Sequence, residues 1–154
     1  MRRVRPEEHP GGHRTTNMLF PASIALLLLA SLLSPLIVRY VKGASGWLLA
    51  LVPAGLFSAY LAQAGSLAHG GALAWTQSWM PSLDLALSFR LDGLSLLFSL
   101  LITGIGVLII VYAGGYVSDY RKKARLLAFL FLFMASMLGV VLADNLLLLF
   151  IFWE

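Results

Sequence analysis

Long apolar runs with charge only near their ends constrain this chain more than any other feature. The clearest covers residues 19–41, in which Arg39 is the first charged residue. A helix needs roughly 20 predominantly apolar residues to cross the hydrocarbon core of a bilayer. Charged residues make up only 12% of the chain, whereas a soluble domain usually carries about 25%. The sequence therefore predicts a membrane protein rather than a water-soluble fold.

Further apolar runs predict an all-α, polytopic bundle of about four complete transmembrane helices plus half of a fifth. The expected helices are residues 19–41, 47–63, 92–117, 126–143 and a truncated 145–154. Together they make one transmembrane domain over residues 19–154. A polar N-terminal tail, residues 1–18, has almost no apolar content and is expected to be disordered.

Residues 65–90 are less hydrophobic and are expected to lie outside the membrane, at its interface. Trp75 and Trp79 fit the aromatic belt that marks membrane–water boundaries. From residue 83 to residue 90, leucine or phenylalanine alternates strictly with other residues. This period of two predicts a short strand or hairpin arm.

Basic residues predict the orientation of the helices. Four of them lie between Arg121 and Arg125, in what is expected to be a loop, and such clusters favour the cytoplasmic side. The N-terminus is then expected to face outward. The basic residues of the tail oppose this orientation, so it is favoured more strongly if the chain starts at Met18 than if it starts at Met1.

The sequence gives no support for nucleic-acid binding, cofactors or metals. The net charge of +4 comes from the tail and from helix ends, where basic residues set membrane orientation. Cysteine is absent, which excludes disulfides and thiolate metal sites. His9 and His13 are separated by proline and glycine, which prevent a helix that would align them. Gly104 and Gly106 lack a third glycine and indicate helix packing rather than a dinucleotide turn.

Glu154 is the most informative single residue. Asp144 and Asn145 form a predicted turn and N-cap for the fifth helix, and Glu154 follows Asp144 by ten residues. At about 1.5 Å per residue it is expected about 15 Å into a core roughly 30 Å thick. Acidic residues at such depth mark ion or proton pathways. A helix ending there would leave carbonyl groups unsatisfied in lipid, so the chain is expected to be truncated. The alternative is a re-entrant or interfacial segment with Glu154 facing water.

Several motifs in residues 89–154 resemble one family. They are Phe89-Arg90-Leu91-Asp92-Gly93-Leu94-Ser95, Tyr112-Ala113-Gly114-Gly115-Tyr116, Met137-Leu138-Gly139, Ala143-Asp144-Asn145-Leu146 and Phe152-Trp153-Glu154. Taken together they resemble the A-type subunit of the Mrp-type multisubunit monovalent cation/proton antiporters. This family is related to the antiporter-like subunits of respiratory complex I.

The resemblance implies that Glu154 binds and translocates protons together with a lysine on a later helix, which this chain does not contain. Asp144 and Asp92 are candidate accessory residues, although a solvated interfacial pair of Asp92 with Arg90 is the favoured interpretation for Asp92. The implied partners are other subunits of a hetero-oligomeric complex, protons, Na+ or K+, and the lipid bilayer. The implied location is the cell (inner) membrane, as a multi-pass secondary transporter rather than an enzyme. Two alternatives remain: a proton-translocating membrane subunit of an NADH:quinone oxidoreductase-type complex, and a structural membrane protein.

Overall fold

The computed structural model describes residues 18–41, 43–67, 71–80 and 85–154, without the side chains of residues 79, 80 and 85. The predicted disordered tail therefore lies outside the described residues, except for Met18. Four long helices dominate: α1 (Leu19–Tyr40), α2 (Ser45–Leu67), α3 (Gly93–Tyr116) and α4 (Tyr120–Leu142). Each is long and apolar enough to cross a membrane, so the predicted helical, multi-pass fold is confirmed. A short fifth helix, α5 (Leu146–Trp153), follows.

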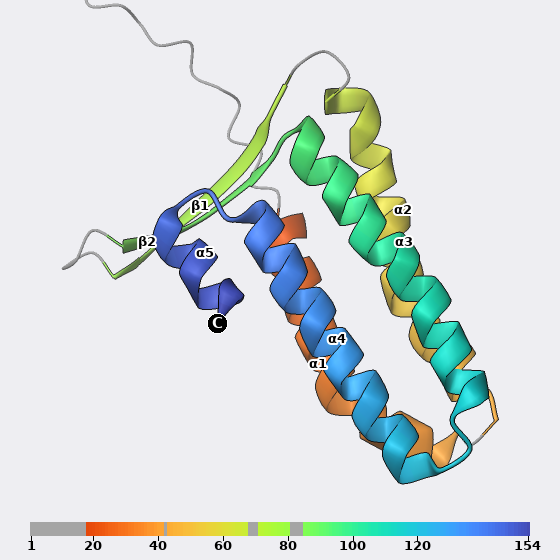
Figure 1. Cartoon of the computed structure of the whole chain (residues 1–154). Coiled ribbons are helices and arrows are strands. Elements are labelled where there is room, and N and C mark those ends of the chain that lie inside the picture. The colour runs from red at the N-terminus through yellow and green to blue at the C-terminus, as the bar shows by residue number, and fades with distance from the viewer. Residues whose placement is uncertain (1–17, 42, 68–70, 81–84) are drawn as a thin grey trace, which may run out of the picture.

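The long helices pack as two antiparallel pairs. Figure 1 shows α1 beside α4 and α2 beside α3, and α3 and α4 join the two pairs. Fully buried side chains such as Leu27, Tyr60 and Phe131 fill the space between the helices. A hydrogen bond also joins the two pairs, because the hydroxyl oxygens of Ser23 on α1 and Tyr60 on α2 lie 2.8 Å apart.

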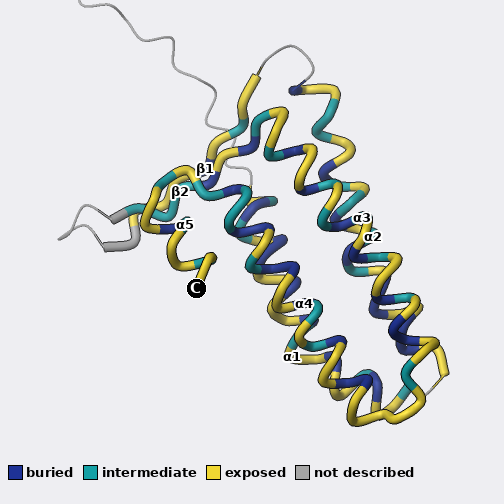
Figure 2. The backbone as a smooth tube through the Cα atoms, in the orientation of Figure 1, coloured by how far each residue is buried: buried dark blue, intermediate teal, exposed yellow. Residues whose placement is uncertain are grey.

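The outer sides of the helices remain apolar. Leu32, Leu51 and Leu108 are at least 65% exposed, and Figure 2 shows exposed bands along all four helices. Monomeric soluble proteins rarely expose contiguous apolar surface on this scale. Exposed apolar side chains on all four helices are instead typical of a helix bundle that lies in a lipid bilayer.

The fourth helix begins earlier than the sequence predicted. It starts at Tyr120 rather than residue 126, so the basic residues expected in a loop form its first turns. Asp119 caps this end, since its Oδ1 accepts a 2.9 Å hydrogen bond from the Arg121 amide. Lysine and arginine are good helix formers, and a backbone helix need not end where the lipid ends. The second helix likewise extends beyond the predicted 47–63, and residues 65–67, expected outside the helix, are helical.

Two strands interrupt the helices between α2 and α3. Strand β1 (Leu73–Met80) pairs antiparallel with β2 (Leu85–Leu91), and Trp75 lies opposite Phe89. The predicted strand is confirmed at β2, whose Phe89 and Leu91 are buried while Arg90 is exposed. In Figure 1 this hairpin lies at the end of the bundle where α3 begins and α4 ends.

Candidate functional site

The turn between α4 and α5 is fixed to strand β2 by backbone and side-chain hydrogen bonds. The Asp144 amide donates to the Ser88 carbonyl over 2.9 Å. The Asn145 side-chain amide donates to the Ala86 carbonyl, also over 2.9 Å. Ala143 forms an isolated bridge with Phe89. Two motifs far apart in sequence, at residues 89 and 143–145, are therefore in direct contact.

The side chains of Asp144 and Asn145 in this turn make different hydrogen bonds. Asn145 is the N-cap of α5, because its Oδ1 accepts a 2.7 Å hydrogen bond from the Leu148 amide. The Asp144 carboxylate instead accepts a 3.1 Å hydrogen bond from the Ser88 hydroxyl. That hydroxyl also lies 3.2 Å from the hydroxyl of Thr76 on β1. The prediction of a capped turn is confirmed, with Asn145 rather than Asp144 as the cap.

Aromatic rings hold α5 against the hairpin and α4. The Phe89 ring lies between those of Trp75 and Phe152, with centroid separations of 5.9 Å and 6.3 Å. The Phe152 ring covers Gly139 of α4 so closely that a Cβ at residue 139 would collide with it. The sequence identified Phe89 as part of a strand and Gly139 as part of a motif, but nothing local in the sequence pairs either with Phe152 or Trp75.

Glu154 follows the last residue of α5. Its amide donates to the Phe150 carbonyl over 3.1 Å, and its side chain is exposed. The eight residues of α5 correspond to about 12 Å at 1.5 Å per residue. Figure 1 shows α5 turning back beside α4 from the hairpin end, with the residue-154 end pointing away from the hairpin. The structure thus places Asp144 at the hairpin and Glu154 at the other end of α5.

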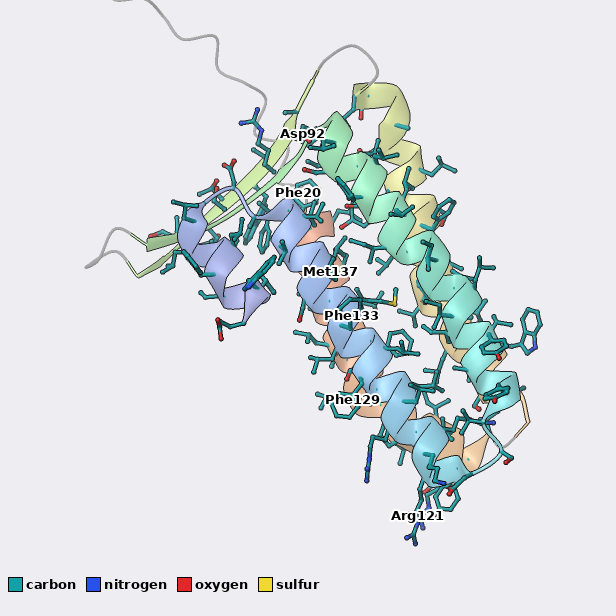
Figure 3. All side chains as sticks on the ribbon, in the orientation of Figure 1. Phe20, Asp92, Arg121, Phe129, Phe133 and Met137 are labelled. Carbon is teal, nitrogen blue, oxygen red and sulfur yellow. The ribbon has the colours of Figure 1, made fainter. Side chains whose placement is uncertain are left out.

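Asp92 lies at the hairpin end of α3 (Figure 3) and acts as its N-cap. Its Oδ1 accepts a 2.8 Å hydrogen bond from the Ser95 amide. This backbone hydrogen bond lowers the pKa of Asp92, and the charge of Arg90 lowers it further. Asp92 therefore stays ionised at neutral pH and has a clear structural role at the start of α3.

Metal coordination finds no support in the part of the chain that the structure describes. Among those residues, no group of three or more histidine, cysteine, aspartate or glutamate side chains could hold an ion. A cavity of about 230 Å³ between α3 and α4 is lined by apolar residues, including Phe133 and Met137 of α4 (Figure 3). Its lining supplies neither charge nor oxygen side chains for a cation.

Comparisons with known proteins agree with this arrangement. Residues 75–126 match a family described as the N-terminus of chain 5 of NADH-ubiquinone oxidoreductase (complex I). The chain is 40% identical over 137 residues to the A1 subunit of the Na(+)/H(+) antiporter of Staphylococcus haemolyticus, covering 88% of this chain and 17% of that protein. The Staphylococcus aureus protein of the same name is 39% identical with the same coverage.

A solved structure is also similar. A chain in the structure of the Mrp complex from Dietzia sp. DQ12-45-1b superposes with a TM-score of 0.72 and 31% identity. The match covers 88% of this chain and 14% of that chain. The chain thus spans less than a fifth of the relatives that it matches. From the motifs, the helical fold and these similarities, we conclude that the chain belongs to the family of A-type subunits of Mrp antiporters and matches the N-terminal region of that family.

Proposed function

We propose that this chain is the N-terminal part of a multi-pass subunit of a monovalent cation/proton antiporter in the cell membrane. Its similarity to the A1 subunit of a Na(+)/H(+) antiporter over 88% of its length supports this function. The four helices that are long and apolar enough to cross a membrane fit a transport subunit that lies in the bilayer. The similar chain in an Mrp complex supports assembly with other subunits. In this proposal the chain is part of a secondary transporter and catalyses no covalent chemistry.

We further propose that Glu154 carries the proton. This proposal rests on a difference in hydrogen bonding among the acidic residues near the hairpin and α5. In the part of the chain that the structure describes, hydrogen bonds occupy the carboxylates of Asp92 and Asp144 but not that of Glu154. A carboxylate at the end of an apolar helix that is not used for capping or docking is a candidate for proton exchange, because acidic residues at membrane depth mark proton pathways.

The docked turn supports this role by giving α5 a defined starting point. Asn145 caps the helix, while Asp144 and Asn145 attach its start to β2. Because a helix rises by about 1.5 Å per residue, a fixed start sets the depth of Glu154. Asp144 then acts as a positioning residue in the proposed mechanism, Asp92 caps α3, and the proton is bound and released at the Glu154 carboxylate.

The test replaces Glu154 in the full-length subunit within its complex. Glu154→Gln keeps the shape of the side chain but cannot exchange a proton, so cation-dependent proton movement should be lost. Glu154→Asp should keep partial activity, because it titrates in a similar pH range but is one methylene shorter. The measurement is fluorescence-reported proton exchange in everted vesicles at matched protein levels.

The matched control is Asp119→Asn, which also removes one negative charge but lies at the opposite end of α4. Asparagine is a good N-cap, so this variant should fold and exchange protons like the wild type. Wild-type exchange by Glu154→Gln would show that Glu154 does not carry the proton. Equal losses in both variants would indicate a general effect of charge.

The match to the complex I description favours a second function for residues 75–126, a membrane subunit of a redox-driven proton pump. The two functions differ in their energy source. An antiporter exchanges cations for protons in vesicles without an electron donor, whereas a redox-driven subunit requires one. Exchange that appears only after NADH is added would favour this second function.

A further inference from the structure

A groove between the ends of α1 and α4 joins positive charge to an apolar surface. It encloses about 620 Å³ and lies at the end of the bundle opposite the hairpin. Its charged part is formed by Arg39, Arg121 and Arg125. Leu36, Ala128 and Phe129 contribute to its apolar part. No carboxylate is among the described residues that line it.

The helical repeat explains why these residues share a groove. Arg121, Arg125 and Phe129 are spaced four residues apart and therefore lie on one face of α4. On the antiparallel α1, Leu36 precedes Arg39 by three residues. The two helices are held together beside the apolar part, because the Ser31 hydroxyl donates a 2.8 Å hydrogen bond to the Ala128 carbonyl.

Charge and apolar surface are ordered along the membrane normal. Arg39 is in the last turn of α1, and Arg121 and Arg125 are in the first turns of α4. They therefore lie at the end of the bundle, and Leu36 and Phe129 lie nearer its middle; in a bilayer that the helices cross, this order places the arginines at headgroup level and the apolar residues deeper. Figure 3 shows the same order for Arg121 and Phe129 along α4. Leu36 and Phe129 are 51% and 62% exposed in the bundle.

The other charged groups at this end strengthen the positive potential. Lys122 and Lys123 are adjacent to the arginines, and Asp119 is the acidic residue among the described residues of this end. Asp119 lines two neighbouring cavities but not the groove itself. The Arg121 Nε donates a 2.9 Å hydrogen bond to the Tyr120 hydroxyl, which leaves the outer nitrogens of the guanidinium for another acceptor.

We propose that this groove is a binding site for one anionic phospholipid. Its phosphate contacts Arg39, Arg121 and Arg125, and an acyl chain lies along Leu36, Ala128 and Phe129. Basic pockets between transmembrane helices bind anionic headgroups in this way. A free phosphate ion would satisfy the arginines but leave the apolar part uncovered, so the combination selects a lipid. This site is independent of the proposed proton pathway.

Native mass spectrometry of the full-length subunit in its complex tests the site. Dioleoyl-phosphatidylglycerol or dioleoyl-phosphatidylcholine is added from mixed micelles, and bound lipids are counted. We expect the anionic lipid to bind preferentially. Arg125→Gln should weaken its binding about fivefold, in line with the usual contribution of one basic residue at a charged membrane surface.

Lys122→Gln is the matched control, because it removes one charge from the same turns of α4 but does not line the groove. It should weaken binding clearly less than Arg125→Gln does, and Arg125→Lys should retain most of the affinity. Equal losses for Arg125→Gln and Lys122→Gln would overturn the site in favour of general surface attraction. Displacement by inorganic phosphate would reassign it to a free anion. Failure of the complex to bind the anionic lipid would show that another subunit covers the groove, and would overturn the proposal.

Discussion

Gly139 and Phe152 show how an uncharged contact can position a charged residue. Phe152 lies two residues before Glu154, and its ring occupies the space where a side chain at residue 139 would be. The same ring contacts Phe89 of the hairpin. Phe152 is therefore held from two sides, and the last turn of α5 is held with it. In our proposal, this contact keeps the proton-carrying carboxylate in place.

A double-mutant cycle tests this contact. Gly139→Ala should destabilise the packing of α5 by about 1–3 kcal/mol, the usual cost of overpacking, and should reduce proton exchange. Phe152→Ala should also reduce exchange, because it removes the ring. Adding Gly139→Ala to Phe152→Ala should cost little more, since the space is then empty. Amide hydrogen exchange of α5 provides the measurement, and strictly additive effects would contradict direct contact.

At the scale of elements, hydropathy predicted the four long helices and the alternation predicted strand β2. The errors lie at the helix ends, most clearly at α4, which begins at Tyr120 rather than residue 126. Hydropathy reports where lipid contacts a helix, whereas helix ends are set by backbone hydrogen bonds and caps such as Asp119. The lipid boundary and the end of the helix therefore differ by several residues.

The contact between α2 and α3 makes an element-scale prediction. A Cβ added at Gly114 would collide with the backbone of Gly46, and a Cβ added at Gly46 would lie 2.7 Å from the Gly114 Cα. A Cβ added at Gly115, the next residue after Gly114, would meet nothing within 4 Å. Gly114→Ala should therefore destabilise the bundle by about 1–3 kcal/mol. Gly115→Ala should be neutral or stabilising, since alanine favours helix over glycine by about 1 kcal/mol.

Reversible unfolding of the full-length subunit in mixed micelles measures both glycine variants. Both variants replace glycine by alanine on α3. A difference between their free energies of unfolding therefore reports the close approach of α2 and α3 at Gly114. Equal stabilities for the two variants would contradict the close contact at Gly114.

At the scale of the whole molecule, the candidate site depends on contacts between distant segments. The sequence identified Asp92, Asp144 and Glu154 as acidic residues of interest, and the resemblance suggested the role of Glu154. It did not predict that Ser88 accepts and donates hydrogen bonds at the α4–α5 turn. Such pairings depend on how the helices bring β2 beside the end of α4. A single sequence carries no local signal for that arrangement.

The two ends of the bundle differ in charge, and this difference predicts its orientation. Of the described residues, Arg39, Arg121, Lys122, Lys123 and Arg125 lie at the end opposite the hairpin, whereas Arg90 lies at the hairpin end. Basic residues near helix ends favour the cytoplasmic side. The hairpin is therefore expected outside the cytoplasm, with α5 entering the membrane from that side.

Single cysteines test this orientation directly, because the chain contains none of its own. Ser78→Cys places a thiol on the exposed part of β1, and Ser118→Cys places one at the exposed turn before α4. A membrane-impermeant maleimide should label the first variant in intact cells and the second only in everted vesicles. The two substitutions are chemically identical and each serves as the control for the other. Labelling of Ser118→Cys in intact cells would reverse the orientation and would place the arginine groove in the outer leaflet.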